Sequence, residues 1–122
     1  MNQSIFQFNK LPLKTRQQQV ESTLEKHPDK IPVLCEIDIS KSNLKPLDQI
    51  KYLVSSNMTV GGLTGAIRKK IDLDPSKALF VMNYTTKKCL PSGQLLEIAY
   101  QKYKDTDLFL KLLFVAENTF GQ

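Results

Sequence analysis

The chain has 122 residues and a formal net charge of +5, with 41% apolar and 24% charged residues. This length suffices for one domain with a modest core and is too short for two. Two cysteines and one histidine exclude a disulfide scaffold and a structural zinc site. The net charge is too small and dispersed to indicate nucleic-acid binding, and it suits an acidic peptide partner or an anionic membrane surface.

The first ten residues contain no continuous apolar segment, so no signal peptide is expected. The longest apolar stretch, 108–116, is interrupted by Lys111 and is too short to span a bilayer as a helix. These features predict a cytoplasmic protein with free thiols at Cys35 and Cys89. Because Cys35 shares a strand face with Val33, we expect it to be buried, whereas His27 is expected on the surface.

Two helical segments are expected before residue 29. A short turn is predicted around 5–9 and a longer helix over 13–26, with Pro12 between them. Alternating apolar residues predict a strand over 31–37, and a second strand is expected over 50–54. Thr59 is a good N-cap for a helix that runs to about Ile71, with Leu63, Ile67 and Ile71 on its inner face.

The second half continues this alternation of strands and helices. A strand is predicted over 79–82, a short strand at Cys89-Leu90, and a helix over 94–104 with Leu95, Ile98 and Ala99 facing inward. The apolar segment 108–116 is expected to be the central strand of its sheet. The order after residue 30, β-β-α-β-β-α-β, predicts an α+β fold of the β-grasp type.

Motifs of enzymatic chemistry are absent from the sequence. It has no nucleophile elbow, zinc-protease motif, Walker loop or dinucleotide fingerprint. Gly61 and Gly62 open a helix instead of following a strand, which argues against a phosphate-binding loop. The sequence therefore predicts a binding module that is not an enzyme and needs no metal or cofactor.

Several short segments occur in a characteristic order and spacing. They are PDKIPV at 28–33, KYLV at 51–54, MTVG at 58–61, IRKKI at 67–71, ALF at 78–80, and FG at 120–121. In these segments the chain resembles the autophagy-related ubiquitin-like modifiers, the GABARAP and light-chain-three group, over about residues 6–122. The resemblance implies a helical subdomain over 1–28, a ubiquitin-like β-grasp domain over 29–118, and a flexible conjugation tail over 119–122.

The resemblance gives the C-terminus a chemical role. It implies that a cysteine protease cleaves after Phe120-Gly121 and removes Gln122. Activating and conjugating enzymes then join Gly121 to phosphatidylethanolamine on the autophagosomal membrane. A glycine without a Cβ suits narrow enzyme channels, and two acyl chains give stable anchoring. Two alternatives remain open: an interaction domain that is never conjugated, and a modifier that is joined to protein.

The resemblance also implies a groove for aromatic-x-x-aliphatic peptides of cargo receptors and adaptors, which add as a strand to the edge of 51–54. The first pocket would be lined by Pro32, Lys51, Leu53 and Phe109. The second would be lined by Tyr52, Val54, Met58, Leu63 and Ile67. Lys30, Lys51 and Lys70 would meet acidic residues that flank the motif. About half of these apolar side chains are also expected to serve the core.

Departures from the family pattern predict a divergent member. Thr23 replaces an aliphatic residue and should make the first pocket more polar. Gly65 and Ala66 replace larger apolar residues, so the second pocket should be wider or shallower. Gly61, Gly62 and Gly65 are expected to thin the helix beside that second pocket.

Overall fold

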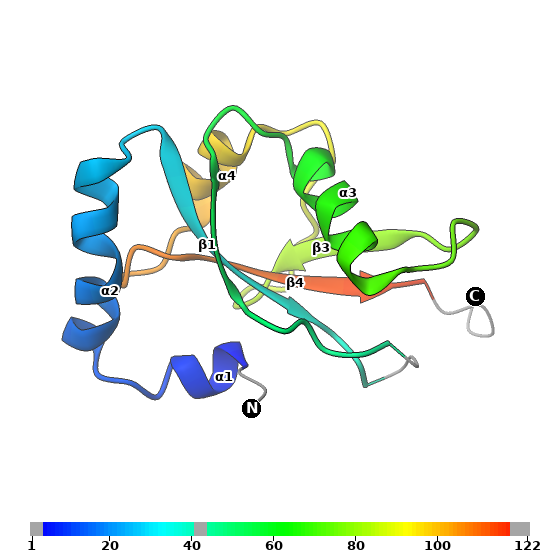
Figure 1. Cartoon of the computed structure of the whole chain (residues 1–122), viewed down its shortest axis with the longest axis horizontal. Helices are drawn as coiled ribbons and strands as arrows, with labels where there is room; N and C mark the ends of the chain where they lie inside the picture. The colour runs from blue at the N-terminus through cyan, green and yellow to red at the C-terminus, as the bar shows by residue number, and fades with distance from the viewer. Residues whose placement is uncertain (1–3, 41–43, 118–122) are drawn as a thin grey trace.

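The computed structural model describes residues 4–40 and 44–117, which form four helices and four strands (Figure 1). In chain order these are α1 (Ile5–Phe8), α2 (Leu13–Lys26), β1 (Lys30–Ile37), β2 (Lys51–Ser55), α3 (Val60–Ile71), β3 (Leu79–Asn83), α4 (Leu96–Tyr103) and β4 (Leu110–Ala116). The two expected N-terminal helices are confirmed, with bounds close to those predicted.

The four strands form one mixed sheet in the order β2-β1-β4-β3. The two central strands, β1 and β4, run parallel, while β2 and β3 pair antiparallel to them at the outer edges. This topology confirms the predicted β-grasp arrangement and the central position of the last strand. It leaves β2 as an outer strand, which is the geometry that strand addition requires.

Helices cover both faces of the sheet (Figure 1). On one face, α3 and α4 pack over the odd-numbered residues of β1, such as Val33 and Cys35, to form the main core. On the other face, α1 and α2 pack over Leu34 to form a second cluster that includes Phe8 and Phe109. Successive residues of a strand point to opposite faces, so neighbouring residues of β1 serve different clusters.

Local sequence explains α3 well. The hydroxyl of Thr59 accepts a hydrogen bond from the N–H of Gly62 at 3.0 Å, which caps the helix as predicted. Leu63 and Ile67 are buried on its inner face, while Ile71 is only partly buried. The helix ends at Asp72, whose φ of 51° places it in the left-handed region.

Two predictions for the second half are wrong. Cys89 makes only an isolated bridge with Met82, so Cys89-Leu90 is not a strand. Helix α4 begins at Leu96, because Leu95 is extended and bridges to Thr59. The predicted inner face of α4 is also wrong except at Ala99: the buried residues are Leu96 and Ala99, whereas Leu95 is 43% and Ile98 is 45% exposed.

Candidate peptide-binding site

The predicted peptide groove lies along the outer edge of β2. Within the described residues β2 pairs only with β1. The N–H of Cys35 donates to the carbonyl of Ile50 at 2.8 Å, which fixes the alternation of hydrogen-bonded pairs along the antiparallel ladder. By that alternation the backbone groups of Lys51 and Leu53 face away from β1, toward the open edge.

The residues predicted for the first pocket share the sheet face that α1 and α2 cover. Pro32 and Leu53 are direct register partners, and Lys51 lies two residues before Leu53 on the same side. Leu53 is 39% exposed and Lys51 is exposed as well, but Phe109 is only 3% exposed. The structure therefore brings these four residues to one side of β2, with Phe109 beneath the surface.

The residues predicted for the second pocket share the opposite face, toward α3. Tyr52 and Met58 are half-buried and pack against the main core. Val54, Leu63 and Ile67 are buried in that core, with 9%, 3% and 1% exposure. On this side Tyr52 and Met58 are therefore the predicted residues that offer the most accessible surface.

The predicted lysines lie around β2. Lys30 pairs in register with Ser55 at the end of β2, and Lys51 opens that strand. The ammonium of Lys70, at the end of α3, lies 5.6 Å from the centre of the Tyr52 ring. Cations at both ends of β2 and beside Tyr52 are an arrangement that attracts acidic residues on both sides of a bound motif.

A hollow beside the start of β2 was missed in the sequence. It has a volume of about 690 Å³ and lies between the 44–49 segment and the end of α3, with Tyr52 and Lys70 in its wall. Burial and, to a smaller extent, the negative charge of Asp48 raise the pKa of Tyr52 to about 12. The apolar residues Leu44, Leu47 and Ile50, spaced three apart, were the available signal that this loop is anchored to the core.

The expectation that the glycines lie beside the second peptide pocket is wrong for two of them. Gly61 and Gly65 line a hollow of about 470 Å³ between α3 and β3, on the side of α3 away from β2. Gly61 is also closely packed, because a Cβ there would lie 3.1 Å from the carbonyl oxygen of Ser92. Ala66 is exposed.

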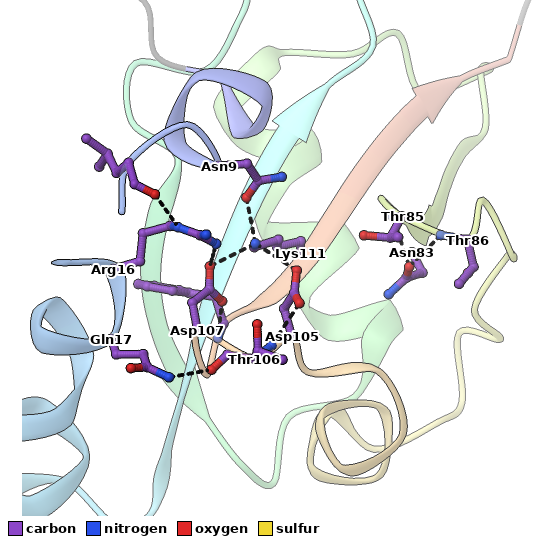
Figure 2. A network of polar contacts seen from close by, with 12 residues as sticks. Asn9, Arg16, Gln17, Asn83, Thr85, Thr86, Asp105, Thr106, Asp107 and Lys111 are labelled. Carbon is purple, nitrogen blue, oxygen red and sulfur yellow. Dashed lines mark hydrogen bonds and ion pairs between the residues drawn. The ribbon is translucent and has the colours of Figure 1, made fainter. Parts of the chain in front are cut away.

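A buried ionic cluster joins the N-terminal helices to β4 (Figure 2). The ammonium of Lys111 lies 2.8 Å from Asp107 and 2.9 Å from Asp105, and it donates to Asn9 at 2.6 Å. Arg16 of α2 binds the same Asp107 carboxylate at 2.7 Å. The side chains of Lys111 and Asp107 are 2% and 0% exposed, so each buried charge is balanced by partners.

The remaining candidates for chemistry do not assemble into a catalytic centre. Cys35 is fully buried, and burial raises the pKa of its thiol, whereas Cys89 is exposed. His27 lies on the surface as expected. Over 4–40 and 44–117, no group of three or more His, Cys, Asp or Glu side chains is placed to hold a metal.

Two further observations concern the membrane and the C-terminus. No helix in the described part of the chain is both long and apolar enough to cross a bilayer. The predicted conjugation residues Phe120, Gly121 and Gln122 lie outside the described residues.

Comparison with known proteins identifies relatives over most of the chain. A family model, "Autophagy protein Atg8 ubiquitin like", matches residues 15–121. Autophagy-related protein 8 of Gibberella zeae is 38% identical over 111 residues, covering 91% of this chain and 92% of that protein. The protein of the same name from Aspergillus niger is 38% identical over 110 residues, covering 90% and 91%. The crystal structure of Trypanosoma brucei ATG8 matches with a TM-score of 0.82 at 37% identity, covering 98% of this chain and 100% of that chain.

Proposed function

This chain belongs to the Atg8 family of ubiquitin-like autophagy proteins, and we propose that it is cleaved after Gly121 and joined to phosphatidylethanolamine on autophagic membranes. The family is one of modifiers and not of enzymes, so the chemistry at the tail is carried out by a protease and by activating and conjugating enzymes. The observation that carries the proposal is that the family match runs as far as residue 121, the glycine at which cleavage is proposed.

The proposed tail reaction has four steps. Hydrolysis of the peptide bond between Gly121 and Gln122 frees the Gly121 carboxylate and releases glutamine. ATP adenylates that carboxylate with loss of pyrophosphate, and an enzyme cysteine displaces AMP to form a thioester. The lipid amine then attacks the thioester, which forms an amide and releases the thiol. The product carries two acyl chains, enough for stable anchoring of a cytoplasmic protein to the membrane.

The second part of the proposed function is recruitment of cargo receptors and adaptors through aromatic-x-x-aliphatic motifs. The outer edge of β2 supports it, because the backbone groups of Lys51 and Leu53 point away from β1. The partly exposed side chain of Leu53 supports it on one face, and half-buried Tyr52 does so on the other. Backbone pairing supplies affinity and the flanking side chains supply specificity.

A pair of substitutions tests this recruitment. Leu53→Ala should weaken binding of an acidic peptide that contains Trp-Ser-Ser-Leu by about tenfold, since truncating an interface anchor costs more than about 1 kcal/mol. Ile98→Ala is the matched control, because Ile98 is 45% exposed and lies on α4. Equal affinities of both variants in a calorimetric titration would show that the peptide does not use this side of β2.

A further inference from the structure

An aromatic residue of the chain itself covers the floor of the first predicted pocket. The rings of Phe8 and Phe109 pack against each other in a T-shaped arrangement, with centroids 5.2 Å apart and planes at 83°. The two side chains are 6% and 3% exposed. The aromatic side chain of a bound peptide can therefore contact Phe109 only if it displaces the ring of Phe8. Otherwise it binds nearer the surface, above Phe8.

The polar groups around this pocket are also engaged within the chain. The ammonium of Lys51 donates to the side-chain oxygen of Gln19 on α2 and lies 5.7 Å from the centre of the Phe8 ring. The carbonyl of Lys51, an outward-facing acceptor of the β2 edge, accepts a hydrogen bond from the side-chain amide of Gln49 at 3.0 Å. A docking strand would compete with Gln49 for that carbonyl.

Helix α1 carries Phe8 and is attached by few contacts. It has only four residues, so it has little stability of its own and depends on docking. Besides the buried side chains of Ile5 and Phe8, two hydrogen bonds attach it to the rest of the described chain. The N–H of Ile5 donates to Glu36 at 2.8 Å, and Asn9 accepts from Lys111 at 2.6 Å.

We propose that α1 is a self-inhibitory cover of the peptide groove, in which Phe8 occupies the place of the motif's aromatic residue and the contact between Asn9 and Lys111 is the latch. This inference rests on the proposed motif binding at β2. A peptide binds only when α1 is displaced, so its apparent affinity equals the intrinsic affinity multiplied by the open fraction. Weakening the cover raises that fraction and tightens binding.

Substitutions on α1 provide a matched test in the full-length chain. The probe is a fluorescein-labelled peptide with acidic residues before Trp-Ser-Ser-Leu, titrated by fluorescence anisotropy. Phe8→Ala removes the cover, and Asn9→Ala releases the latch while leaving the ring in place. Both should lower the dissociation constant at least about threefold. Phe6→Ala, on the same helix at a side chain that is 61% exposed, should leave it unchanged.

Hydrogen exchange supplies a readout that does not depend on affinity. The amides of Asn9 and Phe8, bonded to Ile5 and Ser4, should exchange faster when peptide is added and faster still in Asn9→Ala. If both Phe8→Ala and Asn9→Ala remain folded and bind no more tightly than the parent, the cover is refuted while motif binding stands. If no variant binds the peptide and Leu53→Ala changes nothing, the proposed recruitment itself is refuted, and the cover with it.

Discussion

Replacing Lys111 by methionine tests the energetic role of the buried ionic cluster. Methionine keeps a long unbranched side chain but removes the ammonium that contacts Asp105, Asp107 and Asn9. Among the described residues, the buried Asp107 carboxylate then retains Arg16 at 2.7 Å and the N–H of Phe109 at 3.1 Å. The variant therefore leaves a buried carboxylate with one of its two cationic partners.

The expected cost follows from that loss of balance. Removing one partner of a buried ion pair typically costs about 3–5 kcal/mol of unfolding free energy. Because Arg16 still neutralises Asp107, we expect the lower end, about 3 kcal/mol, which for a domain of this size lowers the melting temperature by roughly 10 °C. The matched control is Lys102→Met on the exposed side of α4, which should change stability by less than about 0.5 kcal/mol.

Urea denaturation followed by circular dichroism measures both variants, and Asp107→Asn completes a double-mutant cycle with Lys111→Met. The amide keeps the hydrogen bond from Phe109 but removes the charge, so the double variant should be more stable than the sum of the single losses predicts, by about 1–3 kcal/mol. The reasoning is refuted if Lys111→Met is as stable as the parent or if the two losses are additive.

The same cluster gives the fold an acid-sensitive component. Partial burial of Asp105 disfavours its charge, but the hydrogen bonds from Lys111 and Thr106 and the charges of Lys111 and Arg16 outweigh this and hold the pKa of Asp105 below its usual value. A lowered pKa in the folded state stabilises the fold above the unfolded-state pKa, near 4, and this contribution is lost as pH falls through the folded-state pKa. Asp105→Asn should therefore cost stability at pH 7 and little at pH 2, as measured by thermal melts.

Two further predictions concern the glycines of α3 and the thiols. Gly65→Ala should raise the unfolding free energy by up to about 1 kcal/mol, because a Cβ built there meets no atom within 4 Å apart from the backbone around it in the helix. Gly61→Ala should lower the unfolding free energy through contact with Ser92. Urea denaturation that gives both variants the same sign would contradict this. In the native protein Ellman's reagent should titrate Cys89 rapidly and leave Cys35 unreacted until denaturant is added, since Cys89 is exposed and Cys35 is buried; two equally fast thiols would show that the core is open.

The predictable parts of this structure are those that local sequence determines. The cap at Thr59 and the apolar spacing of Leu63 and Ile67 specify α3 within one stretch of chain, and its bounds were predicted well. The bridge between Met82 and Cys89 and the start of α4 depend on pairing between distant segments. The sequence of a single segment does not show which distant segment it pairs with. The short strand at Cys89-Leu90 and the inner face of α4 were therefore predicted wrongly.

In the groove and in the ionic cluster, too, local features were predictable and contacts between distant residues were not. The placement of Pro32 and Leu53 on one side of the sheet follows from strand alternation, whereas Phe109 was assigned to that side through the family resemblance. The cover by Phe8 depends instead on a contact between residues about a hundred positions apart. Lys111 was visible as a charge within an apolar strand, and its acidic neighbours are close in sequence, but its contact with Asn9 and the link to Arg16 appear only once the chain is folded.

The measurement that tests the central claim most directly is the mass of the protein after reconstituted conjugation. The full-length chain is incubated with the Atg8-processing protease, the activating and conjugating enzymes, ATP and vesicles that contain phosphatidylethanolamine, with Gly121→Ala as the control variant. The account predicts loss of the mass of Gln122 and gain of one phosphatidylethanolamine on Gly121, with no lipid on the variant. The account is contradicted if the parent chain retains Gln122. It is also contradicted if the parent chain becomes attached to protein instead of lipid.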